Sequence, residues 1–272
     1  MPQRQGRQPH SDRGFALLLV LWSLVLLTLI TTRLIASGRD EARLTSNLRA
    51  AAQAEMLADA AVNEAVFRLL TRTPGWSADG QRHRAVLPGG VADILIEDEA
   101  ARVNPNQASA PLLQALLQAT GADAGTARSI AAAIMDWRAT GATARQFGAK
   151  LPEYSAAGRD FAPPQSPFRS VDEVGLVLGM TPALLARISP YLSVFYDGDP
   201  DPETASPLVL AALKQAAGQA NIGGSGQAGR RTVRLTASAA GTAGGRFVRR
   251  AVVQLVPDSA ARPYRLLDWR RG

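Results

Sequence analysis

The sequence predicts an α+β protein, in which a long N-terminal helix, transmembrane at its start, packs on a small antiparallel sheet and a large all-α segment is inserted. Three observations predict it. An uncharged run from Phe15 to Thr32 continues without proline into an amphipathic pattern. Strand-like alternation occurs on both sides of a long central segment, and that segment, residues 105–195, has helical patterns.

The uncharged run "FALLLVLWSLVLLTLITT" is the first element. As a helix it measures about 27 Å, enough for the hydrocarbon core of a bilayer. The apolar part of a secretory signal is about 7–15 residues, so this run is long for one. We therefore predict a transmembrane helix over residues 15–38. Because Arg4, Arg7 and Arg13 precede the run, the short N-terminal arm is expected in the cytoplasm and the body outside.

A cleavable signal peptide is the alternative, since "LIASG" at 34–38 offers small residues. Helical continuity argues against it, because a discarded signal has no need to continue into the domain behind it. The continuation carries a stripe at steps of four and three, formed by Leu44, Leu48, Ala51, Glu55, Ala58, Val62, Ala65 and Leu69. Thr71, Thr73, Pro74 and Gly75 end this helix.

Strands are predicted on both sides of the central segment. Two short strands flank Pro88–Gly89–Gly90, the second with apolar Val91, Ile94 and Ile96. A hairpin is predicted near the C-terminus about a glycine-rich turn. Its alternating apolar positions are Val233, Leu235 and Ala237 in the first arm and Phe247, Ala251, Val253 and Leu255 in the second.

The central segment has several helix signals. "SAPLLQALLQATG" starts with a well-placed proline and ends at Gly121, and the next helix has Ile130, Ile134 and Trp137 on one face. Ser170 with Glu173 predicts a capping box. Residues 178–182 predict a tight turn between two short helices, a helix-hairpin-helix or SAM-like unit.

Residues 104–116, "NPNQASAPLLQAL", and 201–213, "DPETASPLVLAAL", share one pattern. Asn, Asp and Ser suit helix caps and proline suits the first turn. We interpret them as two similar helix starts at the two edges of the insertion.

Catalytic patterns are missing from the sequence. It has no cysteine, and its two histidines, His10 and His83, lie on opposite sides of the predicted span. It has no HExxH, P-loop or nucleophile elbow. We therefore expect no enzyme. The net charge of +7 is compatible with nucleic acid, anionic lipid or acidic protein partners, and does not choose among them.

The basic leader, the Gly14–Phe15 junction, the apolar helix and its amphipathic continuation resemble the type IV pilin and pseudopilin class. The resemblance implies that prepilin peptidase removes residues 1–14 by cleavage between Gly14 and Phe15 and N-methylates Phe15. Most members have glutamate at the fifth mature position, whereas this sequence has Leu19. That absence suits a subunit with nothing above it in the filament.

Four stretches, "AAAIMDWRA", "SPFRSVDEVGLVLGM", "ISPYLSVF" and "YRLLDW", are similar to the protein K family, the largest minor pseudopilins of type II secretion. The resemblance implies an inner-membrane protein with a periplasmic body that caps the pseudopilus tip, with the I- and J-type minor pseudopilins as partners. It implies five parts: a leader at 1–14, the membrane helix at 15–38, the helix and first strands at 39–104, the insertion at 105–195, and a linker with the last strands at 196–272.

Two further readings stay open. The helix-hairpin-helix pattern could hold DNA phosphates in a membrane-anchored, pilin-like DNA-binding protein, but the hairpin has no lysine, and Asp172 and Glu173 would repel phosphate, so no nucleic acid is expected. The loop "DGDPDPE" could offer Asp197, Asp199, Asp201 and Glu203 to Ca²⁺, which some members of the family bind. It is no EF-hand, and a solvated loop is the other interpretation. No other cofactor is expected.

Overall fold

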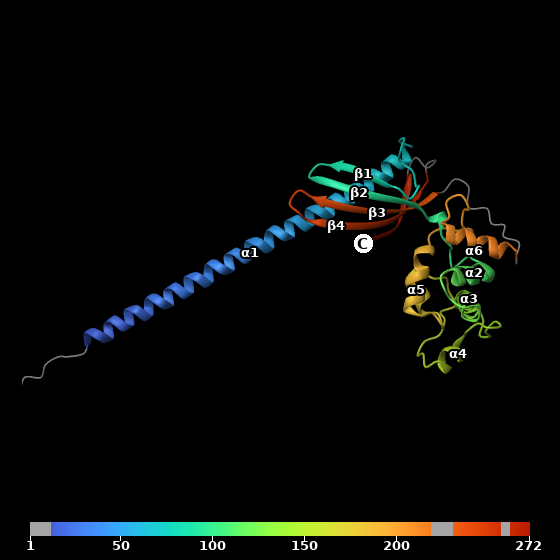
Figure 1. Ribbon diagram of the computed structural model, residues 1–272, viewed down its shortest axis with the longest axis horizontal. Helices are drawn as coiled ribbons and strands as arrows, with labels where there is room; N and C mark the ends of the chain where they lie inside the picture. Colours follow the sequence, from blue (N-terminus) through green and yellow to red (C-terminus); the bar gives the residue numbers. More distant parts are fainter. Residues whose placement is uncertain (1–11, 219–230, 257–261) are drawn as a thin grey trace, which may run out of the picture.

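The computed structural model describes residues 12–218, 231–256 and 262–272, and the side chains of 12–14, 16, 33–40 and 42 lie outside the described set. The chain forms a long helix, two strands, a series of helices and three more strands (Figure 1). In order, they are α1 (Asp12–Leu70), β1 (Arg82–Leu87), β2 (Gly90–Asp98), η1 (Glu99–Ala101), α2 (Ala110–Ala119), α3 (Ala124–Arg138), α4 (Leu151–Ala156), η2 (Val171–Leu176), α5 (Pro182–Ile188), η3 (Ser189–Tyr191), α6 (Pro207–Ala217), β3 (Arg231–Gly241), β4 (Arg246–Leu255) and β5 (Tyr264–Arg271).

The strands form one antiparallel sheet in the order β1-β2-β3-β4-β5. The alternation predicted for the C-terminal hairpin is confirmed, because all seven of its predicted inward residues are buried. β5 was not expected as a strand. Its sequence, YRLLDWRR, has no apolar–polar alternation, and the register with β4 shifts between Val252 and Val253. A β-bulge of this kind interrupts the period of two on which strand prediction depends.

α1 packs on one face of the sheet and then projects well beyond it (Figure 1). The predicted stripe is confirmed where the sheet covers the helix, with Ala58, Val62 and Ala65 buried. It is wrong for its first members: Leu44, for example, is exposed, and so are Leu48 and Ala51. For Leu44 and Leu48 the reason is the extent of the sheet, whose cover begins only at Ala50, whereas Ala51 and Glu55 lie after that point and are exposed all the same.

The helices between β2 and β3 have a hydrophobic cluster of their own, formed around α2, α3 and α6. α6 lies in residues 196–272, which the sequence predicts to be linker and strands. It is the helix whose start was predicted at 201–213, and it packs against α2 and buries Val209, Ala212 and Ala216 in the helical cluster. Burial of one apolar face is what stabilises so short a helix.

The repeated sequence pattern forms two equivalent helix starts, as predicted. Ser109 accepts a hydrogen bond from the Leu112 amide at the start of α2, and Ser206 accepts one from the Val209 amide at the start of α6. The predicted capping box at Ser170 is wrong. Ser170 makes no cap bond, and Glu173 instead accepts from the Arg169 amide, because the segment is a 3-10 helix whose first turn is wound more tightly.

Candidate assembly surface

The apolar run of α1 lies bare in the structure. Phe15 and Trp22 are 67% and 70% exposed, and Leu19 is 55% exposed. The hydroxyl groups in the run are all used internally: Ser23, Thr28 and Thr31 each donate to the carbonyl four residues earlier, and so does Thr32. This surface therefore offers only apolar groups, and suits lipid or the apolar face of another helix.

Among the described residues, no helix has both the length and the apolar character needed to cross a membrane. The predicted span, residues 15–38, includes Ala16 and residues 33–38, whose side chains lie outside the described set. The transmembrane prediction therefore stays a prediction.

The predicted processing site lies at the start of α1. Gly14 and Phe15 are both helical, and the surroundings of Gly14 lie outside the described set. The predicted leader, residues 1–14, falls almost entirely outside the described residues. Leu19 lies one turn further along, where its carbonyl accepts from Ser23. Cleavage and methylation stay predictions.

A hydrogen-bonded ion pair holds α1 on the sheet. Arg249 of β4 donates from Nε to Asp59 Oδ1 and from Nη2 to Glu55 Oε1, each at 2.6 Å. The hydrogen bonds to Asp59 and Glu55 raise the pKa of Arg249. The sequence signal was Arg249 in the alternating apolar row of the strand, between Phe247 and Ala251, and only the fold could supply its two partners.

A second group of charges joins the helical segment to the sheet. Glu99 in η1 is fully buried, and it accepts from Arg234 Nε of β3 at 2.6 Å. Arg102 donates from Nη2 to Glu97 Oε1 at 2.7 Å and from Nε to the Pro190 carbonyl. Burial lowers the pKa of Arg234, and the charge of Glu99 acts in the opposite direction. These bonds fix η1 against β3 at the root of the inserted helices.

Two of the four acidic residues proposed for Ca²⁺ accept hydrogen bonds from different donors within the chain. Asp201 Oδ1 accepts from the Glu203 amide at 2.9 Å, and Asp197 Oδ1 accepts from Gln107 Nε2 at 3.4 Å. Within the described ranges, no group of three or more His, Asp or Glu side chains could hold a metal ion. The geometry gives the Ca²⁺ prediction, which included Asp199, no support, and it stays a prediction.

The hairpin between η2 and α5 uses its backbone amides within the chain. The Leu178 amide donates to the Tyr154 hydroxyl at 3.0 Å, and the Met180 amide donates to the Val177 carbonyl. Phosphate binding by a helix-hairpin-helix needs such amides to point outward. The geometry therefore does not favour the DNA-binding alternative.

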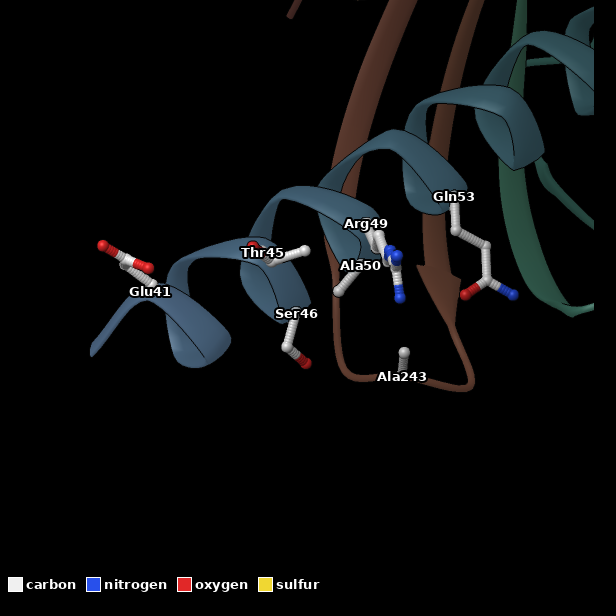
Figure 2. A pocket seen from close by; sticks show the side chains of 7 residues that line it. All are labelled: Glu41, Thr45, Ser46, Arg49, Ala50, Gln53 and Ala243. Carbon is white, nitrogen blue, oxygen red and sulfur yellow. The ribbon is translucent and has the colours of Figure 1, made fainter. Parts of the chain in front are cut away.

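An open hollow of about 580 Å³ lies where α1 passes the turn between β3 and β4 (Figure 2). Figure 2 shows Glu41, Thr45 and Arg49 along the helix, with Ala243 of the turn nearby. Gln53 at its far end donates to the Gly89 carbonyl at 3.3 Å. The residues that line it include no nucleophile–base pair, so it marks only the point where α1 leaves the sheet.

The architecture is one long N-terminal helix, bare over its first part, that packs from Ala50 onward on an antiparallel sheet. Residues 91–197 match the model of the family "Type II secretion system (T2SS), protein K". This segment of the chain therefore matches the protein K family, and the resemblance found in the sequence is confirmed.

The fold is similar to a solved one. A chain in the crystal structure of the GspK–GspI–GspJ complex of the enterotoxigenic Escherichia coli type 2 secretion system matches with a TM-score of 0.58. The identity is 16%, and the match covers 87% of this chain and 99% of that chain. At this identity the likeness concerns the fold. No curated protein matches the sequence.

Proposed function

We propose that this protein is a minor pseudopilin that caps the tip of the type II secretion pseudopilus. It takes part in assembly of the pseudopilus and in export of folded proteins across the outer membrane. The observation that carries the proposal is the bare apolar helix that begins at Phe15, in a chain whose residues 91–197 match protein K. A helix without a cover in its own chain needs lipid or other subunits to remove its apolar surface from water.

Membrane insertion and processing belong to the same proposal. The protein is a single-pass inner-membrane protein with a periplasmic body, and prepilin peptidase cleaves between Gly14 and Phe15 and methylates Phe15. The mass of the membrane-extracted chain tests this: loss of residues 1–14 and gain of one methyl group are expected, and Gly14→Val should block both. An N-terminus near Gly38 or Arg39 would instead mean a conventional secreted protein.

The tip position rests on Leu19, which offers no carboxylate to the terminal amine of a subunit above it. The neighbour would be an I- or J-type minor pseudopilin, as in the complex that the similar fold comes from. The volume of the inserted helices between β2 and β3 is a steric bar to a further subunit above. The proposed mechanism is therefore assembly.

Immunogold labelling of overproduced pseudopili tests the position. Label at one fibre end is expected, and regular label along the shaft would overturn the tip assignment. Leu19→Glu should bring no gain in secretion, because a carboxylate there has no amine to pair with. Placing a carboxylate within the apolar run costs on the order of a few kcal/mol of membrane-insertion free energy, so a lower protein level is expected. Leu18→Glu, at the neighbouring position, controls for the effect of charge alone.

A further inference from the structure

The sheet has one face covered by α1 and a second face that turns away from it. The side chains that alternate with the buried core residues point to this second face, and they include Leu95, Thr236, Arg250 and Arg270. The strand register places these four residues in one row across β2, β3, β4 and β5. We name them the open-face row. It contains two guanidinium groups and no carboxylate.

Two like charges of this row lie directly opposite each other. Arg250 and Arg270 are register partners on β4 and β5, and both are exposed. Like charges directly opposite each other on neighbouring strands destabilise a sheet. Arg270 donates to Asp268 in its own strand, whereas no described residue forms a hydrogen bond or ion pair with the Arg250 guanidinium. Arg250 therefore destabilises the described part of the chain and is accessible to an anion from outside.

The open-face row forms part of the floor of a cleft of about 1090 Å³. The inserted helical segment lines this cleft as well, with Val171 of η2 and Tyr191 of η3. The volume is larger than the roughly 300–1,000 Å³ of small-ligand pockets. From β2 to β5 the floor spans three strand spacings, about 14 Å, which an extended peptide covers with about four residues. The cleft therefore suits a peptide segment better than a small molecule.

The charges of the cleft indicate the chemistry of its occupant. At the β4–β5 end, the guanidinium groups of Arg250 and Arg270 can together bind one carboxylate. Asp172 and Glu203, both exposed, line the same cleft and would repel a uniform polyanion such as nucleic acid. The other charged side chains that line it are hydrogen-bonded within the chain. Leu95 offers an apolar contact. A protein segment with a few carboxylates among apolar side chains matches this pattern.

We propose that this cleft binds an extended, acidic segment of a partner protein. A carboxylate of the segment lies between Arg250 and Arg270, and an apolar side chain of the segment packs on Leu95. The bound carboxylate offsets the repulsion between the two guanidinium groups. The inference goes beyond the proposed function, because it assigns a binding site to the face of the sheet away from α1. It does not depend on the position of the subunit in a filament.

Fluorescence anisotropy with the detergent-extracted full chain tests the proposal. The probe is a labelled peptide with blocked ends, in which glutamate alternates with valine over about eight residues, enough to span the floor of the cleft. We expect saturable binding that weakens as the salt concentration rises. The matched peptide with glutamine in place of glutamate should bind about tenfold more weakly or less. A labelled DNA oligonucleotide should also bind more weakly than the glutamate peptide.

Substitutions locate the binding site. Arg250→Glu should weaken binding of the glutamate peptide about tenfold or more, because a second carboxylate replaces the cation. Arg246→Glu makes the same change on the same strand and the same face, outside the cleft, and should leave binding within about twofold of the wild type. Thermal unfolding is the second readout. Arg250→Glu should raise the Tm, because an opposite charge then faces Arg270. A loss of binding in a stabilised variant does not come from misfolding.

Any of four results would overturn the inference: no binding of the glutamate peptide, equal binding of the two peptides, stronger binding of the oligonucleotide, or an equal loss of binding in Arg250→Glu and Arg246→Glu. A lower Tm of Arg250→Glu would contradict the repulsion between Arg250 and Arg270 and overturn it as well. The proposed function stands in each case, because it rests on the bare helix and the family match.

Discussion

At the scale of single residues, the charges with the largest structural effect are those that the fold buries. Glu99 has no exposed surface, and both Arg234 and Arg102 point to its carboxylate. Charges taken out of water are stable only when they are paired and hydrogen-bonded. Glu99 therefore determines how the inserted helices are joined to β3.

Glu99→Ala should destabilise the protein strongly, because it leaves the half-buried Arg234 without its carboxylate. Breaking a buried pair from one side costs about 3–5 kcal/mol. Thermal or chemical unfolding of the detergent-extracted protein measures the loss. Arg270→Ala, which removes the exposed pair with Asp268, is the control and should cost less than about 1 kcal/mol. Equal losses in the two variants would contradict this account of the joint.

Asp123 at the start of α3 predicts a pH dependence. Hydrogen bonds from the Thr126 side chain and from the Thr126 and Gly125 amides lower the pKa of Asp123 below its usual 3.8. Because the pKa of Asp123 is lower in the folded than in the unfolded chain, its stabilising contribution is fully present above the usual value. This contribution is lost as the pH falls through the pKa of the folded state. In unfolding measured from pH 7 down to 2, Asp123→Asn should remove this component of the pH dependence. If the wild-type protein showed no such loss of stability at low pH, the role given to Asp123 would be contradicted.

At the scale of the elements, the two proline-containing helix starts were predicted correctly, whereas the capping box at Ser170 was not. Ser109 and Ser206 cap α2 and α6 with the same bond, and each is followed by a proline in the first turn. The signals involved are local, since a cap needs only the three or four residues after it. This is why the repeated pattern could be interpreted from sequence alone.

Ser206→Ala should cost about 1 kcal/mol of stability, because the Val209 amide loses its acceptor. Ser170→Ala is a matched control, since Ser170 makes no cap bond. Chemical unfolding compares the two variants with the wild type. A loss as large at Ser170 as at Ser206 would mean that the effect does not come from the cap.

Elements that depend on distant partners could not be predicted in the same way. The burial of α1 depends on where the sheet ends, so Leu44 and Leu48 were misplaced although their spacing is helical. β5 is stabilised by pairing with β4 rather than by its own pattern. The shared face of Trp269 and Leu266 was missed for that reason, since the two side chains acquire it only through this pairing.

At the scale of the whole molecule, the described residues form two hydrophobic clusters. One lies between α1 and the sheet, and the other lies among the helices between β2 and β3. Hydrogen bonds and ion pairs connect them at Glu99 and Arg102. Each cluster thus has its own apolar interior, and the joint is polar.

Limited proteolysis should show this organisation. Trypsin should cut first within 155–169, at Arg159, because the loop after α4 is exposed. Residues 218–230 are a second early site, as their Gly- and Gln-rich composition predicts. Fragment masses identify the cuts, and Arg159→Gln should remove the first of them. Early cleavage at Arg187 within 176–192 would contradict the packing of α5.

The length of α1 has a mechanical consequence. The helix is continuous over 59 residues, about 88 Å, and contains no proline, and Ser37–Gly38 is a pair of the kind at which helices can kink. A force applied at its first turn therefore passes to the sheet along a single helix. The ion pairs of Arg249 with Glu55 and Asp59 oppose sliding of the helix along the sheet. We expect an axial displacement at the first turn of α1 to reach the sheet through this one helix, with Ser37–Gly38 as the place where bending would reduce it.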